Sequence, residues 1–143
     1  MNSFEKYDLI QCRIARFYER EHGASVVSIG FAPKWDIRFT DGATVEVKVD
    51  ELAAKTLNAA IEFWDVRRNI GTGILATEAQ LWLHCVPQGE GLRCYELKTK
   101  TLLRLCFETG SVRDGGDNGA SRMKLIPLQE LVAVSERDFI LEV

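Results

Sequence analysis

The chain contains few of the residues that most often build metal or redox sites. It has two histidines, His22 and His84, which lie far apart, and four cysteines with no C-x-x-C pair among them. A zinc site therefore has no support, and disulfides are not expected in a reducing compartment. We expect four buried or inert thiols. The cysteines are Cys12, Cys85, Cys94 and Cys106.

Long hydrophobic runs are also missing. No stretch of 18 apolar residues occurs, so the sequence predicts no membrane span. The opening stretch "MNSFEKYDLIQ" lacks the basic-then-apolar pattern of a signal peptide, and we expect a cytoplasmic protein.

An excess of positive charge is absent too. The formal net charge is −3 and the pI is about 5.5, which argues against a strongly basic nucleic-acid coat protein. An enzyme that meets nucleic acid through a local patch is not excluded, because carboxylates at a metal site lower the net charge themselves. The length of 143 residues and the apolar content of 46% are those of a single domain spanning 1–143.

Hydrophobic periodicity predicts an α+β fold. Tyr7, Ile10, Ile14 and Phe17 recur every three or four residues, which predicts a helix over 3–22 that stops at Gly23. A β-branched strand over 25–31, ended by Pro33, and a hairpin over 34–50 follow. Later strands are expected over 59–66, 77–86, 94–97 and 123–128; helices over 50–58, 98–108 and 128–135; and loops over 67–73 and 110–121. The order indicates a mixed sheet flanked by helices.

The register of the hairpin follows from its pattern. Trp35, Ile37 and Phe39 alternate with polar residues in the first strand, as three valines do in the second. A two-residue turn at Asp41-Gly42 would place the two apolar sets on opposite faces. A loop of Thr40, Asp41 and a left-handed Gly42 pairs Phe39 with Ala43 and places both apolar sets on one face.

The same register sets Asp36 opposite Glu46 on the other face. Directly opposed Cβ atoms lie about 4.5–5.5 Å apart, so two carboxylates there need a proton, a lysine or a divalent cation between them. Lys48 is available two residues from Glu46, and carboxylate oxygens suit Mg²⁺ or Mn²⁺. The alternative is a solvated sheet face on which Lys34, Arg38 and Lys48 pair with the two acids.

The pattern D-x9-E-V-K, read here as Asp36, Glu46, Val47 and Lys48, resembles the core motif of the PD-(D/E)xK nuclease superfamily, which has the restriction-endonuclease-like fold. Trp35 stands where the family usually has proline. The stretch "EVKVDELAAKTLNAAIEF" is similar to a small, phage-like subgroup, with Leu57 in place of a usual glycine. "GILATEAQLWLH", with Gln80 where Asp is common, and "LIPLQEL" extend the resemblance to Leu131.

The resemblance implies an N-terminal helix, a three-stranded meander and a metal-dependent deoxyribonuclease of a bacterial or phage-infected cytoplasm. It implies that Asp36, Glu46 and the Val47 carbonyl bind Mg²⁺ or Mn²⁺. It implies that Lys48 positions and helps deprotonate the attacking water or stabilises the phosphate. The family often adds an acid from the first helix, for which Glu5, Glu19 and Glu21 are candidates. Glu62 either lies near the metal or pairs with Lys55.

Further residues are candidate contacts to DNA. Arg13, Arg16 and Arg20 share one helix face and could hold phosphates, although a solvated face is the favoured interpretation. The remaining candidates are Lys55, Arg67, Arg68 and Thr77.

Two other interpretations remain open. One is an inactive nuclease-fold protein that binds nucleic acid or a protein partner, which the complete Asp36, Glu46 and Lys48 set disfavours. The other is an α/β domain unrelated to nucleic acid. A C₂ homodimer is expected if both DNA strands are cut together.

Overall fold

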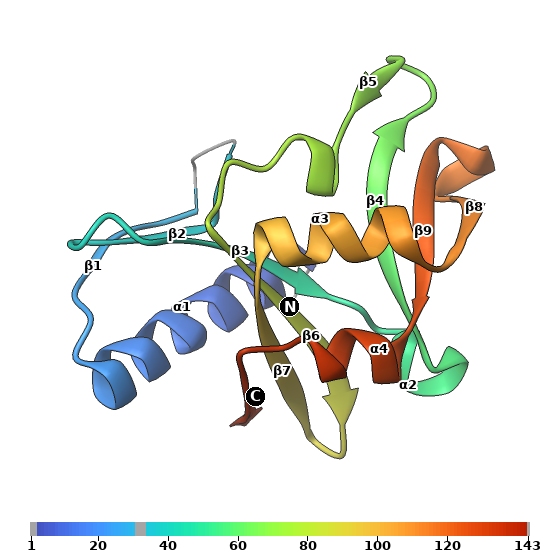
Figure 1. Cartoon of the computed structure of the whole chain (residues 1–143). Coiled ribbons are helices and arrows are strands. Elements are labelled where there is room, and N and C mark those ends of the chain that lie inside the picture. Colours follow the sequence, from blue (N-terminus) through green and yellow to red (C-terminus); the bar gives the residue numbers. More distant parts are fainter. Residues whose placement is uncertain (1–2, 31–33, 143) are drawn as a thin grey trace.

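The strands of the computed structural model, which describes residues 3–30 and 34–142, form two sheets (Figure 1). The six-stranded sheet has the order β1-β2-β3-β6-β7-β10. Its β3–β6 pair is parallel and its other pairs are antiparallel, so the sheet is mixed. Its strands are β1 (Val26–Ile29), β2 (Ile37–Phe39), β3 (Thr44–Val49), β6 (Leu81–Gln88), β7 (Gly91–Lys98) and β10 (Arg137–Glu142).

The second sheet is antiparallel and has the order β5-β4-β9-β8. Its strands are β4 (Asn58–Asp65), β5 (Ile70–Gly71), β8 (Ser111–Gly115) and β9 (Ser121–Pro127). The helices are α1 (Ser3–His22), α2 (Ala53–Thr56), α3 (Thr99–Glu108) and α4 (Leu128–Ala133), with 3₁₀ turns η1 (Gly73–Leu75) and η2 (Asp117–Gly119). None of these helices is long and apolar enough, within the described residues, to cross a membrane.

Two cores lie on opposite faces of the six-stranded sheet. On one face α1 buries Ile10 and Ile14 against β2, β3 and β6, where Ile37, Val45 and Leu83 are fully buried. This burial confirms the apolar stripe predicted for the helix over 3–22, whose bounds match α1.

The opposite face carries the second core, which joins the two sheets and the helices α3 and α4. Trp82 of β6 packs there with Ile61 of β4, Leu102 of α3 and Ile126 of β9. The connection from β3 to β6 runs through α2, β4, β5 and η1, which is the crossover that a parallel pair requires.

A buried carboxylate ties α1 to the far strands of the sheet. Glu96 of β7 is 2% exposed, and its two oxygens accept hydrogen bonds from the Tyr18 hydroxyl and, at 2.9 Å, from Nε of Arg137. Burial, together with the neighbouring Glu96, raises the pKa of the Tyr18 hydroxyl, so this tyrosine stays a neutral donor. The bond fixes how α1 lies across the sheet.

Two predictions about the later elements were wrong or incomplete. The segment 110–121, predicted as a loop from its glycines, contains the strand β8, which is paired along its length with β9. The strand β10 was not predicted, although it pairs with β7 from Arg137 to Glu142. The predicted end of the strand over 25–31, at Phe31 and Pro33, lies outside the described residues.

Leu57 adopts the backbone conformation that glycine would adopt freely. It follows α2 with φ of 58° and ψ of 24°, and its amide donates to the carbonyl of Ala53 at 2.9 Å. A left-handed residue with a Cβ costs about 1–2 kcal/mol, because the Cβ crowds the backbone. The tight turn is therefore present despite the leucine.

We expect Leu57→Gly to stabilise the protein by about 0.5 kcal/mol, because the relief of strain exceeds the entropy that glycine adds to the unfolded chain. Chemical denaturation measures this change. Ala54→Gly, at an exposed right-handed position in the same helix, should instead lose about 1 kcal/mol. Equal losses in the two variants would contradict the strain at Leu57.

Candidate metal centre

The hairpin that carries the candidate site has the predicted register. Ile37 pairs with Val45, Arg38 pairs with Thr44, and the amide of Phe39 donates to the carbonyl of Ala43 at 2.9 Å. Gly42 has φ of +90°, as the three-residue loop requires. The carboxylate of Asp41 accepts from the amide of Ala43 at 2.9 Å, which further fixes the turn.

The ladder between β2 and β3 ends at the pair of Ile37 and Val45, and the two strands separate there. Asp36, the residue before β2, lies in the resulting opening. Its amide makes the last backbone bond, to the carbonyl of Val45 at 2.9 Å. Its Oδ2 then accepts the amide of Val47 at 2.7 Å, in place of a strand carbonyl. We call this opening between β2 and β3, lined by Asp36, Glu46 and Val47, the fork.

The fork exposes a backbone oxygen as well as carboxylates. The N–H and C=O of one residue point to the same side of a strand, so the Val47 carbonyl lies on the side of β3 that faces Asp36. The strand ladder to β2 ends before Val47. The fork thus gathers two carboxylates and one carbonyl.

Glu46 and Lys48 lie on the face of the sheet away from α1. In the β3–β6 pair Glu46 is level with Trp82 and Lys48 with His84, whereas the neighbouring valines face α1. Both acids are half-buried, and Lys48 acts electrostatically on both. The structure therefore brings Asp36, Glu46 and Lys48 together.

The two acids resist losing their protons. Burial raises the pKa of Glu46 to about 7, the negative charge of Asp36 adds to the shift, and Lys48 and the Thr77 hydroxyl oppose it. Burial also raises the pKa of Asp36, against hydrogen bonds from Val47 and Gln11 and the charge of Lys48. Lys48 thus does not fully neutralise the pair.

The other basic residues of the hairpin have different partners. Lys34 forms an ion pair with Glu78 at 2.9 Å, and the guanidinium of Arg38 lies over the Trp35 ring at 5.9 Å. The arrangement in which Lys34 and Arg38 pair with the two acids is therefore not the one the structure adopts.

Thr77 contacts the site from the loop after η1. Its hydroxyl lies 3.4 Å from Oε2 of Glu46 and 3.1 Å from the carbonyl oxygen of Lys34, and can donate its one proton to either. Its oxygen also accepts from the amide of Ala79 at 3.2 Å. The structure thus places Thr77 directly beside the carboxylate of Glu46.

Gln11 is a site residue that the sequence analysis missed. It lies on the face of α1 that looks toward the fork, where it opposes the raised pKa of Asp36, and it lines a hollow of about 290 Å³ with Val47 and Lys48. The resemblance implies an acid from this helix, whereas Gln11 is an uncharged amide. The stripe of Tyr7, Ile10 and Ile14 could have identified it, since Gln11 is the polar residue bordering that stripe.

The candidate helix acids lie elsewhere. Glu19 and Glu21 are exposed at the far end of α1, eight and ten residues beyond Gln11, or about 12 and 15 Å at 1.5 Å per residue. Glu5 lies one and a half turns before Gln11 and is also exposed. Glu62 and Ala60 lie on the same face of β4, and Ala60 lines a hollow with Lys48. Glu62 therefore remains a candidate acid for the metal site.

The candidate DNA contacts are spread over the molecule. Arg13, Arg16 and Arg20 do share one face, lining a hollow of about 640 Å³ beside β10, and Arg13 donates to the carbonyl of Glu142 at 3.0 Å. β10 is three strands from β3, or about 14 Å at the usual spacing. The exposed Lys55, Arg67 and Arg68 lie in α2 and the β4–β5 turn, where Arg68 pairs with Asp65 at 2.8 Å.

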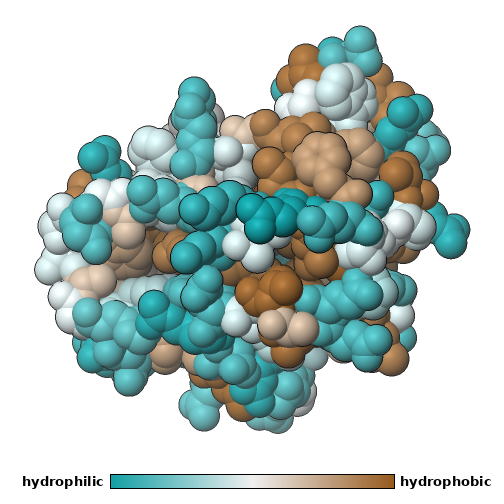
Figure 2. All heavy atoms as spheres, viewed as in Figure 1, coloured by the Kyte–Doolittle hydropathy of each residue, from teal (hydrophilic) through white to brown (hydrophobic). Residues whose placement is uncertain are grey.

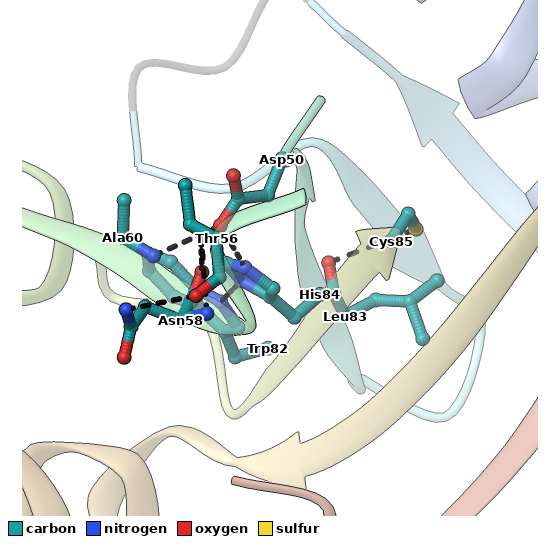
Figure 3. Close-up of polar contacts among 8 residues, drawn as sticks. All are labelled: Asp50, Thr56, Asn58, Ala60, Trp82, Leu83, His84 and Cys85. Carbon is teal, nitrogen blue, oxygen red and sulfur yellow. Dashed lines mark hydrogen bonds and ion pairs between the residues drawn. The ribbon is translucent and has the colours of Figure 1, made fainter. Parts of the chain in front are cut away.

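A buried network supports the strand end that follows Lys48 (Figure 3). His84 is fully buried; its Nδ1 accepts from Nε1 of Trp82 at 3.2 Å, and its Nε2 lies 2.9 Å from Oδ2 of Asp50. Because the indole can only donate, Nδ1 carries no proton and Nε2–H donates to Asp50. Asp50 also accepts from the amide of Ala60 at 2.9 Å, which links β3 to β4.

Asp50 is therefore ionised. Burial would raise the pKa of this carboxyl, but the hydrogen bonds from His84 and the amide of Ala60 outweigh it and hold the pKa below its usual value. The network fixes β3 against β6 and β4 just beyond Lys48.

The donor set of the fork fits Mg²⁺ or Mn²⁺. These ions prefer oxygen ligands, and Mg²⁺ is commonly held by one or two carboxylates with water completing the octahedron. The described residues contain no group of three or more His, Cys, Asp or Glu side chains arranged as metal ligands. An ion in the fork would thus rely on Asp36, Glu46, the Val47 carbonyl and water.

Comparisons with known proteins do not identify the chain. No protein-family model, no curated protein and no solved structure matches it.

Without metal, we expect Glu46→Gln to stabilise the protein at high pH only. The pKa of Glu46 is about 7 in the folded protein and 4.5 in the unfolded chain. As the pH rises from 4.5 to 7, the unfolded chain loses this proton more readily than the folded protein, so the free energy of unfolding falls. A pKa change from 4.5 to about 7 corresponds to about 3 kcal/mol, and solvent around this half-buried carboxylate reduces the effect. The variant should match the wild type below pH 4.5 and gain about 1–3 kcal/mol at pH 8.

Urea denaturation in EDTA at both pH values measures this difference. Glu90→Gln, in the exposed turn after β6, is the matched control and should change little at either pH. A gain for Glu46→Gln that is equal at both pH values would contradict the raised pKa of Glu46.

Proposed function

We propose that this chain is a metal-dependent nuclease that hydrolyses phosphodiester bonds in DNA and has the restriction-endonuclease-like fold. One observation carries the proposal: the hairpin opens at the point where Asp36 and Glu46 face each other, and the pair is left without full neutralisation. The helix followed by a three-stranded meander in a mixed sheet supports the fold assignment.

The residues of the fork would hold the metal. Asp36 is oriented by the amide of Val47 and by Gln11, and Glu46 by Thr77. Such outer contacts fix the direction of ligand oxygens. A bound Mg²⁺ or Mn²⁺ would supply Lewis acidity and a more acidic water.

Lys48 would act on the substrate. Its position one step beyond Glu46 on the same face places an ammonium group beside the metal ligands. There it would attract the scissile phosphate, orient the attacking water and offset charge that develops on the phosphate oxygens. The support of β3 by Asp50 and His84 limits the movement of the strand that carries Lys48.

A binding protein without cleavage activity is the second candidate. The acidic net charge of −3 favours it, because a DNA-cleaving enzyme must approach a polyanion. In that case the fork would retain metal without turnover. A homodimer and a cytoplasmic location remain part of the nuclease proposal.

We expect the purified protein to cut DNA with Mg²⁺ or Mn²⁺ and not in EDTA. Asp36→Asn, Glu46→Gln and Lys48→Met should each reduce the rate at least about 100-fold, because each removes a group that acts on the reacting phosphate. Arg93→Met, whose ion pair with Asp138 lies at the other edge of the sheet, should keep the rate.

A gel assay on plasmid, single-stranded and junction DNA measures these rates. Cutting that persists in EDTA or in the three site variants would come from a contaminant or another site. Absence of cutting on every substrate, with metal still bound, would favour the binding protein.

A further inference from the structure

We infer that the surface along α3 binds a single-stranded segment of the nucleic acid, next to the bond at the fork. This inference rests on the proposed function and names its substrate class. It concerns one continuous surface, formed by two adjoining hollows and the exposed face of α3, which we call the α3 track.

The α3 track begins at the metal site. A hollow of about 710 Å³ is lined by Thr77, whose hydroxyl lies 3.4 Å from Glu46, and also by Lys98 and Lys100 at the start of α3. Glu78 also lines this hollow and is already paired with Lys34 at 2.9 Å. Because Lys98 lies 3.8 Å from Glu136, Lys100 is the basic group that a phosphate leaving the fork would meet.

The track continues into an apolar hollow. The second hollow, of about 250 Å³, shares Ile74, Leu75 and Leu103 with the first and ends at Phe107. Phe107 is 79% exposed and Leu75 is 48% exposed. Figure 2 shows this region as an apolar patch directly beside a hydrophilic band that follows α3.

Two basic residues and one aromatic residue share a face of the helix, with the exposed Glu108 at its end. Lys100, Arg104 and Phe107 occupy positions i, i+4 and i+7 of α3 and are all exposed, so they share one face. Lys100 and Arg104 form no ion pair within the described residues. Lys124 of β9 lines the far end of the apolar hollow.

This combination fits a single strand better than the alternatives. A positively charged groove that follows the backbone, together with an exposed aromatic ring on which a base stacks, is how single strands are bound. A duplex keeps its bases stacked inside and would leave Phe107 without a partner. A purely apolar partner would not explain the two unpaired cations on the same helix face.

The track also offers a length of surface suited to a short strand. Lys100 and Phe107 are seven residues apart, or about 10 Å along α3 at 1.5 Å per residue. The strand would pass from the fork over Thr77 to the basic start of α3, and its next base would reach Phe107. The arrangement would favour DNA with a single-stranded region at the cut.

The test measures binding of a fluorescein-labelled 12-nucleotide oligothymidine by anisotropy in EDTA, beside a 12-base-pair duplex. Phe107→Ala should weaken binding of the single strand about tenfold, since a stacked base contributes about 1–3 kcal/mol. Phe107→Trp should retain it. Val27→Ala, an apolar residue 56% exposed on β1, is the matched control and should change nothing.

Salt dependence tests the cations separately. The double variant Lys100→Ala, Arg104→Ala should reduce the slope of log K against log salt by about 1.4, from two contacts at about 0.7 each. Arg93→Ala, which removes an arginine paired with Asp138 at the other edge of the sheet, is the control and should leave the slope unchanged. A smaller slope with Arg16→Ala on α1, together with an unchanged slope in the double variant, would place the nucleic acid on the arginine face of α1 and overturn the inference.

Cleavage with Mn²⁺ separates failure of this inference from failure of the nuclease proposal. If cutting depends on Asp36 but Phe107→Ala changes the cutting rate equally on single-stranded and duplex DNA, the α3 track is overturned and the nuclease proposal stands. Single-strand binding that depends on Phe107, without any cutting, overturns the nuclease and keeps the track. Light scattering measures the oligomeric state of the same variants. If Phe107→Ala turns a dimer into a monomer and leaves oligonucleotide binding unchanged, the apolar patch binds a second copy of the chain and the inference is overturned.

Discussion

The opening of the hairpin between β2 and β3 determines the chemistry that this fold can offer. The strands pair through Ile37 and Val45, and then Asp36 replaces the next strand carbonyl by accepting the amide of Val47 at 2.7 Å. This exchange directs a carboxylate into the gap beside Glu46. Two half-buried acids then share one small volume. Burial, together with the charge of Asp36, raises the pKa of Glu46 to about 7, which reflects the cost of ionising Glu46 there. A cation in the fork would remove that cost.

Elements on both faces of the sheet keep the fork in place. On one face α1 is fixed by the bond from Tyr18 to the buried Glu96, and it presents Gln11 to Asp36. On the other face the chain Trp82–His84–Asp50 fixes β3 against β6 and β4. Glu46 and Lys48 are thus carried by a strand whose position is fixed from both faces of the sheet.

Much of the site could be predicted from the sequence because its signal is local. The alternation of the hairpin and the Asp41-Gly42 turn determined the register, and the structure has Ile37 opposite Val45 as predicted. The amphipathic stripe likewise predicted the bounds of α1. In each case residues close in sequence contained the whole pattern.

The elements that were missed depend on distant partners. The strand β8 is mostly exposed and lies in the glycine-rich segment 110–121, and only its ladder with β9 makes it a strand. Gln11 carries no charge and has no motif, so its role follows only from the packing of α1 over the fork. The exposure of Phe107 could not be deduced either, because a phenylalanine in an amphipathic helix is more often buried.

The most direct test of the account is a titration of Mn²⁺ into the metal-free protein at pH 8 by isothermal calorimetry, with Asp36→Asn and Glu46→Gln alongside and circular dichroism to verify folding. The account predicts saturable binding to the wild type that both substitutions abolish or weaken at least about tenfold, because each removes a charged oxygen ligand. Equal binding by all three folded proteins, or no binding by the wild type, would contradict a metal centre at the fork.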